Sequence, residues 1–146
     1  MFVIRPLLKE DIPSAAAIEK ACFSMPWSER EIRESFENTE LYRFFAAEED
    51  GKVIGYASMS LILDEADIDN IAVLAEARKR GVGSALLAGL LRCAAENGAS
   101  AAVLEVRDSN SPAIRLYEAF GFRQVGFRKN YYQNPEEGAR IYGRAL

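Results

Sequence analysis

The sequence contains no histidine. Histidine is the commonest metal ligand and the usual general base near neutral pH. Any chemistry must therefore be built from carboxylates, tyrosines or thiols, and we expect no metal site. Cysteine is scarce too, with only Cys22 and Cys93, far apart in the chain. A core of this size needs no disulfide, so we expect two buried or half-buried thiols in a reducing cytoplasm.

Long apolar runs are also missing, since the longest stretches fall well short of the roughly 20 residues of a membrane span. The start, Met1-Phe2-Val3-Ile4, gives way at once to Arg5 and Pro6, which is not the pattern of a signal peptide. Lys and Arg number 18 against 22 Asp and Glu, a net charge of −4. This balance argues against nonspecific nucleic-acid binding. We expect a cytoplasmic protein that binds neither nucleic acid nor membrane directly.

The length of 146 residues fits one domain, residues 1–146, with a substantial core. Strand and helix patterns alternate, which predicts an α/β domain with a mixed sheet. The nearly continuous apolar run Ala101–Val106 predicts a strand buried on both faces. The predicted strands are Phe2–Leu7, Tyr42–Glu48, Lys52–Leu63, Ala66–Leu74, Ala101–Val106, Phe122–Phe127 and Ala139–Leu146. The predicted helices cover residues 11–21, 28–37, the stretch from Gly83 to about Ala95, and 111–120.

A glycine turn, Arg78-Lys79-Arg80-Gly81-Val82-Gly83, joins a predicted strand to the longest predicted helix. Backbone N–H groups at a helix start have no partners, and together with the helix dipole they attract anions. The glycines let a ligand approach the backbone, and three cationic side chains add charge. The turn lacks the Gly-Lys-Ser/Thr ending of a nucleotide P-loop. It also lacks the third glycine and the downstream ribose-binding acid of a dinucleotide site. It predicts a pyrophosphate site; the alternative is an ordinary turn with glycines for close packing.

Glu105 interrupts the apolar strand Ala101–Val106. A lone carboxylate there is costly unless it is paired, hydrated or used, so Glu105 is a candidate general base. The alternatives are a place on a polar side of the strand or an ion pair with Arg107. A second acidic feature, the run that contains Asp67 and Asp69, is typical of a solvated face but could also attract a cationic amine.

The sequence allows two roles each for Tyr117, within the predicted helix 111–120, and for Asn110, just before that helix. Tyr117 follows Ile114 and precedes Phe120 at helical spacing, which favours a core position. A phenol can nevertheless donate a proton to a leaving thiolate. Asn110 is most simply a turn or cap residue, although its amide could bond a ligand.

The chain resembles the GCN5-related N-acetyltransferases (GNAT), essentially end to end. The blocks that carry this resemblance are Ile71-Ala72-Val73, Arg78-x-x-Gly81-x-Gly83, Leu104-Glu105-Val106-Arg107, Ser109-Asn110 and Leu116-Tyr117-Glu118-Ala119-Phe120-Gly121-Phe122. Within the family, it is similar to the bacterial RimI group through Pro26-Trp27-Ser28-Glu29, Leu63-Asp64-Glu65-Ala66, the block around Glu105 and Asn130-Tyr131-Tyr132. RimI enzymes acetylate the N-terminal alanine of a ribosomal small-subunit protein, the eighteenth.

The resemblance implies a mixed, mostly antiparallel sheet with a splayed central strand pair and about four flanking helices. It implies acetyl-CoA as co-substrate, no metal, a ribosomal-protein N-terminus as acceptor, and a monomer or weak dimer. Glu105 matches the family's proton acceptor and Tyr117 its proton donor, which reverses the preference for a core tyrosine. The backbone of Ile71, Ala72 and Val73 would bind the pantetheine arm, and Asn110 would contact the cofactor. The pyrophosphate would be held by Lys79, Arg80, Gly81, Val82, Gly83 and Ser84.

The chain departs from the RimI pattern in its last strand, where Gly138-Ala139-Arg140-Ile141-Tyr142-Gly143-Arg144 replaces an acidic pair followed by aliphatics and a methionine. This strand is expected to flank the acceptor cleft. Trp27 is expected either to shape a peptide groove or to anchor its loop on the core. A small-molecule amine acetyltransferase and a non-catalytic acyl-CoA-binding module remain as alternative functions.

Overall fold

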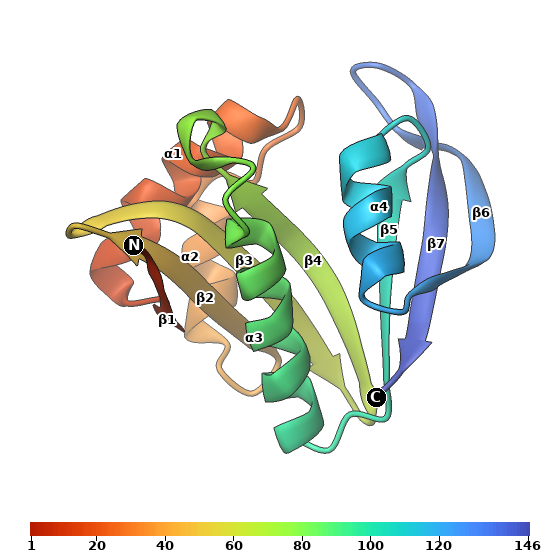
Figure 1. Ribbon diagram of the computed structural model, residues 1–146, viewed down its shortest axis with the longest axis horizontal. Helices are drawn as coiled ribbons and strands as arrows, with labels where there is room; N and C mark the ends of the chain where they lie inside the picture. The colour runs from red at the N-terminus through yellow and green to blue at the C-terminus, as the bar shows by residue number, and fades with distance from the viewer.

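The computed structural model describes residues 1–146 and forms one seven-stranded sheet with α-helices on both faces (Figure 1). The strands are β1 (Val3–Pro6), β2 (Tyr42–Glu49), β3 (Lys52–Ile62), β4 (Glu65–Val73), β5 (Ala101–Arg107), β6 (Arg123–Tyr132) and β7 (Glu137–Ala145). The α-helices are α1 (Ile12–Cys22), α2 (Glu29–Glu37), α3 (Val82–Glu96) and α4 (Ser111–Ala119), with short 3-10 helices η1 (Lys9–Asp11) and η2 (Ala75–Ala77). None of these helices has the length and apolar character needed to cross a membrane.

The sheet order is β1-β2-β3-β4-β5-β7-β6, and every neighbouring pair is antiparallel except β4 and β5. These two parallel strands pair only from Glu65 opposite Ala101 to Ile68 opposite Leu104. Beyond that point they diverge, and Figure 1 shows the gap widening between them. The predicted mixed sheet with a splayed central pair is confirmed.

A β-bulge lies where the two strands part. On β3, Ser58 pairs with Asn70 and Met59 pairs with Ile68, so Asp69 is an extra residue of β4. A bulge bends its strand and increases the local twist. The bend turns the second half of β4 away from β5 and thereby opens the sheet.

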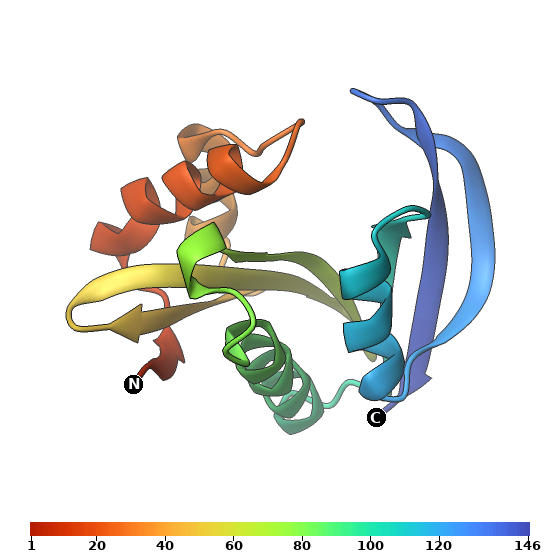
Figure 2. The ribbon, with the colours of Figure 1, turned by 45° about the horizontal axis from the view of Figure 1, so that its top comes forward.

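Helices cover the two faces of the sheet. Figure 2 shows α1 and α2 on one side of the first four strands and α3 on the other. Ile12 and Ile32 belong to one buried cluster beneath α1 and α2, whereas Leu86 and Leu90 of α3 share the second with residues of α4 and β5. The α2 start is set by a reciprocal cap in which the Ser28 hydroxyl accepts the Glu31 N–H at 3.1 Å.

Burial along β5 alternates. Ala102, Leu104 and Val106 are buried in the cluster beneath α3 and α4, while the residues between them are half-buried. The prediction of burial on both faces is therefore wrong. The reason is that α1 and α2 pack on β2, β3 and β4 rather than on β5, so the other face of β5 has no helix above it.

Candidate functional site

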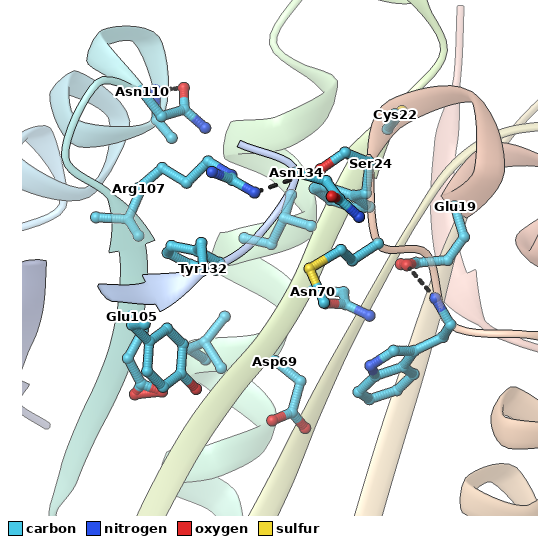
Figure 3. A pocket seen from close by; sticks show the side chains of 18 of the residues that line it. Glu19, Cys22, Ser24, Asp69, Asn70, Glu105, Arg107, Asn110, Tyr132 and Asn134 are labelled. Carbon is cyan, nitrogen blue, oxygen red and sulfur yellow. Dashed lines mark hydrogen bonds between the residues drawn. The ribbon is translucent and has the colours of Figure 1, made fainter. Parts of the chain in front are cut away.

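The divergence of β4 and β5 opens a cleft of about 590 Å³ (Figure 3). Its walls come from α1 and the loop after it, from β4 and β5, from α4, and from β6 and the turn that follows. Four of the predicted site residues line this cleft, namely Ile71, Glu105, Asn110 and Tyr117. The sheet thus brings together residues from separate parts of the chain.

Glu105 is the first residue of β5 beyond its last pair with β4, which is Leu104. Its side chain is half-buried, lines the cleft, and makes no ion pair. The alternative pairing with Arg107 is wrong. The Arg107 guanidinium instead pairs with Glu137 at 3.2 Å and lies over the ring of Tyr132, 4.6 Å from its centroid. Glu105 therefore presents an unpaired carboxylate to the cleft.

Tyr131 of β6 lines the cleft beside this carboxylate. Burial, followed by the charge of Glu105, raises the pKa of the Tyr131 phenol, so this hydroxyl stays protonated near neutral pH. The Tyr131 hydroxyl therefore lies close to the Glu105 carboxylate, and as a protonated phenol it can donate to one of the two carboxylate oxygens. A carboxylate has several acceptor sites. The Glu105 oxygens therefore remain available to a ligand.

Tyr117 is both a core residue and a cleft residue. Its side chain is only 8 % exposed and packs edge-on against Phe122, as helical spacing predicts. Its hydroxyl makes no hydrogen bond, and the residue also lines the cleft. Burial, reinforced by the neighbouring Tyr132, raises the pKa of the Tyr117 phenol. A phenol with a raised pKa stays protonated near neutral pH, so Tyr117 holds a proton there and is not a candidate base.

Asn110 caps α4, as the turn pattern indicates. Its side-chain oxygen accepts the N–H of Ala113 at 3.3 Å. Its amide nitrogen has no partner within the protein and faces the cleft (Figure 3). One end of the side chain fixes the helix start, and the other remains free to donate to a ligand.

The glycine turn presents a row of unpaired amides. No backbone N–H from Lys79 to Ser84 donates to an acceptor in the protein, and the first bond of α3 runs from Ala85 N to Gly81 O at 3.0 Å. Gly81 has φ +85° and Lys79 has φ +63°, so the chain turns sharply before the helix. Six free N–H groups at the start of a 15-residue helix form a site that fits an anion such as a diphosphate.

The cationic side chains of this turn contribute less than the sequence indicates. The Arg80 guanidinium pairs with Glu49, which also accepts the N-terminal ammonium of Met1 at 3.1 Å. The Arg78 side chain donates to the carbonyl of Val73 at 3.0 Å. Of the three cations, only Lys79 makes no ion pair or hydrogen bond. The unpaired backbone amides are thus the main feature of the turn that fits an anion.

The free edge of β4 continues toward this turn. From Ile71 to Val73 the strand pairs with β3 on one side, whereas its pairing with β5 has already ended at Ile68. Backbone groups on the open side have no strand partner there, although the Val73 carbonyl accepts from the side chains of Arg78 and Cys22. An extended ligand with amide groups can bind such an edge as an added strand would.

Sequence reasoning missed Glu19 of α1, which is 1 % exposed. Its carboxylate accepts hydrogen bonds from the Tyr56 hydroxyl and, at 2.8 Å, from the Trp27 N–H, while Asn70 donates to the Tyr56 oxygen at 3.2 Å. Burial raises the pKa of Glu19. This network ties the loop after α1 to β3 and β4. The sequence does indicate a buried position for Glu19, since this residue lies one helical turn after Ala15 on the apolar face of its helix.

Trp27 packs against the buried cluster beneath α1 and α2, as expected of a loop anchor, and its backbone N–H donates to Glu19. Trp27 also lines the cleft, and its role in shaping a peptide groove stays a prediction. The divergent segment of residues 138–144 does not line the cleft; it lies in β7, which pairs with β5 from Ala101 to Arg107 on the side away from β4. Because β7 lies between β5 and β6, which both line the cleft, the expectation that this strand flanks the acceptor cleft stays a prediction. The structure also contains no group of three or more acidic or cysteine side chains placed to hold a metal ion.

Comparison with known proteins agrees with this geometry. Residues 12–122 match the family model of the Acetyltransferase (GNAT) family. Over 136 residues the chain is 38 % identical to the ribosomal protein bS18-alanine N-acetyltransferase of Escherichia coli K12, covering 93 % of this chain and 90 % of the relative. A relative of the same name from Haemophilus influenzae is 36 % identical over 138 residues, covering 94 % and 92 %.

Solved structures give the same result. The crystal structure of the ribosomal-protein-S18-alanine N-acetyltransferase from Escherichia coli superposes with a TM-score of 0.88 at 36 % identity, covering 100 % of this chain and 94 % of the other. Ard1 from Thermoplasma volcanium superposes with a TM-score of 0.90 at 28 % identity, covering 99 % and 97 %. The family model spans most of the chain and the curated relatives span nearly all of it, so the chain belongs to the GNAT family of acetyltransferases.

Proposed function

We propose that this protein is an acetyl-CoA-dependent Nα-acetyltransferase that modifies the N-terminal alanine of a ribosomal small-subunit protein. The observation that carries the proposal is the unpaired Glu105 carboxylate in the cleft between β4 and β5, together with the six unpaired amides of the glycine turn that follows β4. The similarity to bS18-alanine N-acetyltransferases over more than nine-tenths of the chain supports this choice of acceptor. GNAT proteins use acetyl-CoA as the acetyl donor.

The donor-binding elements follow from the backbone. The amides of Lys79, Arg80, Gly81, Val82, Gly83 and Ser84 hold the pyrophosphate, and the open edge formed by Ile71, Ala72 and Val73 binds the amide groups of the pantetheine arm. The free amide nitrogen of Asn110 donates to the same ligand. These contacts place the thioester inside the cleft. Holding both reactants in one cleft supplies much of the rate advantage.

The reaction needs one proton acceptor and one proton donor. An N-terminal amine is mostly protonated near pH 7, because α-amino pKa values lie near 8. Glu105 takes this proton, directly or through water, and the neutral amine attacks the thioester carbonyl. A C–N bond forms, the C–S bond breaks, and Tyr117 gives its proton to the leaving thiolate. The attached nitrogen releases its second proton through water, and this proton restores the Tyr117 phenol, while Glu105 gives up the first proton to the solvent. No covalent intermediate with the enzyme is required.

The acceptor class can be tested with purified protein, acetyl-CoA and a set of peptides with N-terminal alanine. We expect CoA release and a gain of one acetyl group on the peptide α-amine, read by mass spectrometry. Acetylation of polyamines or free amino acids with no peptide modified would replace the protein acceptor with a small molecule. Binding of CoA without turnover of any amine would leave a non-catalytic binding module.

Tyr117→Phe is expected to lower kcat about tenfold and to leave CoA affinity unchanged. This is less than the range of about 10²- to 10⁴-fold for a typical general acid or base. The reason is that a thiol with a pKa of about 8.5 already leaves readily as the thiolate. Steady-state kinetics and calorimetry with CoA measure the two quantities.

Tyr142→Phe provides the matched control. Tyr142 is another buried tyrosine of the same apolar cluster, and its hydroxyl donates to Glu118 at 3.0 Å without lining the cleft. We expect this variant to keep full turnover. Equal rates in the Tyr117 and Tyr142 variants would remove Tyr117 from the reaction.

A further inference from the structure

Asp69 lies in the cleft, and the proposed reaction does not use it. It is the extra residue of the β4 bulge, at the point where β4 and β5 part, and its side chain lines the cleft together with Glu105. Figure 3 shows the two carboxylates at the same end of the cleft, one on each diverging strand. Neither makes an ion pair with the protein. The opening thus has an unpaired carboxylate on each side.

The surroundings leave this negative charge without a cation. Asp69 is an exposed residue, but the protein atoms around its carboxyl group, followed by the charges of Asp67 and Glu105, raise the pKa of this group to about 7. The carboxylate remains open to the solvent within the cleft while protein surrounds it on several sides. The one basic side chain that lines the cleft is Arg107, and Glu137 already pairs with it. A cationic ligand would supply the missing positive charge.

We infer that Asp69 is a specificity-determining residue of the acceptor site, where it and Glu105 bind the ammonium group of the incoming N-terminal amine from two sides. The inference rests on the proposed function, since it names how that acceptor is recognised. An ammonium group has three N–H donors, so it can bond both carboxylates at once. When Glu105 takes one proton, Asp69 keeps a bond to a remaining N–H and holds the amine in place.

The affinity for the peptide amine should depend on pH, and the sign of this dependence follows from the ionisation of the Asp69 carboxyl. Below pH 7 this group is mostly protonated and attracts an ammonium weakly, whereas above pH 7 it is ionised and attracts it strongly. The peptide amine, with a pKa near 8, stays mostly charged up to about pH 7.5. The other titratable and charged groups around Asp69 are Asp67 on β4, Glu105 and Arg107 on β5, Tyr117 on α4, Tyr131 and Tyr132 on β6, and Glu19 and Cys22 on α1.

The experiment measures binding without turnover. A peptide with N-terminal alanine is titrated by calorimetry into the protein saturated with CoA, which carries no acetyl group, at pH 6 and at pH 7.5. We expect the wild-type Kd to fall about fivefold between these pH values, because the ionised fraction of Asp69 rises from about one-tenth to about three-quarters. Asp69→Asn should bind about tenfold more weakly than wild type at pH 7.5, as expected for a lost charge-assisted bond. It should also show no such pH dependence.

Asp67→Asn is the matched control, because it removes the same charge from the same strand at a side chain that does not line the cleft. We expect it to retain the pH dependence with a midpoint at lower pH, since the Asp67 charge contributes to the raised pKa of Asp69. The same peptide with an acetylated N-terminus should bind weakly to every variant. Unchanged CoA affinity shows that Asp69→Asn is folded.

The outcomes separate the two proposals. A wild-type protein that binds and acetylates no peptide would overturn the proposed function and this inference with it. A wild-type protein that acetylates the peptide, while Asp69→Asn keeps the same peptide Kd and the same pH dependence, would overturn the role of Asp69 alone.

Discussion

Glu105→Gln is expected to lower kcat by about 10²- to 10⁴-fold while CoA affinity stays unchanged. Glutamine has nearly the same shape but cannot accept the proton of the incoming ammonium. Glu105 has no ion-pair partner in the protein, so the substitution leaves no buried cation unpaired. The loss should therefore be chemical rather than structural. Steady-state kinetics with an N-terminal alanine peptide and calorimetry with CoA measure the two quantities.

The loss of activity in Glu105→Gln should depend on pH. Well above pH 8 the peptide amine is neutral without help from the enzyme, so kcat/KM of Glu105→Gln should approach that of wild type. Glu65→Gln is the control, because it removes an equal charge at the closed end of the β4–β5 pair, opposite Ala101 and outside the cleft. If Glu105→Gln turned over as fast as Glu65→Gln at pH 7, a group other than Glu105 would have to accept the proton of the incoming amine.

The local features of the fold could be read from the sequence because each depends on residues close together in the chain. The Ser28 cap is completed by Glu31 three residues on, and the Asn110 cap by the N–H of Ala113. The glycine turn is likewise a local device, and its unpaired amides follow from its position before a helix. Such short-range patterns survive in any tertiary context that keeps the helix.

The features that could not be predicted depend on partners distant in sequence. The alternating burial of Ala101–Val106 arises because α1 and α2 pack on β2, β3 and β4 rather than on β5, and no apolar pattern encodes which strands a helix covers. Arg107 lies close to Glu105 in sequence but pairs with Glu137, on a different strand. The position of Asp69 is due to a bulge, which is defined only by its register with β3.

The candidate site likewise contains residues that the sequence identifies and residues whose role depends on partners distant in sequence. Glu105 could be identified because a carboxylate within an apolar strand is costly, whatever the strand packs against. Glu19 was missed because its hydrogen bonds come from Tyr56 and Trp27 on other elements. A buried carboxylate can be suspected from helical periodicity, but whether it is satisfied depends on the tertiary structure.

Gly81→Val should weaken CoA binding at least about tenfold. Gly81 has φ +85°, and a side chain in this region costs about 1–2 kcal/mol, more for a β-branched residue. A Cβ at this position would meet no atom within 4 Å, so the penalty comes from the backbone rather than from a clash. The loop can relieve the strain only by rotating the peptides around residue 81. That rotation reorients the amides of residues 79–84 that we propose to hold the diphosphate.

Gly98→Val separates this effect from a general loss of stability. Gly98 follows the other end of α3 with φ +87°, and a Cβ there would likewise meet no atom within 4 Å, but this glycine lies away from both the turn and the cleft. Both variants should lose a few degrees of Tm, as expected for about 1–2 kcal/mol in a domain of this size. Only Gly81→Val should lose CoA affinity in calorimetry. If the two variants bound CoA equally tightly, the diphosphate would have to be held by side chains such as Lys79, because the direction of the backbone amides would then not matter.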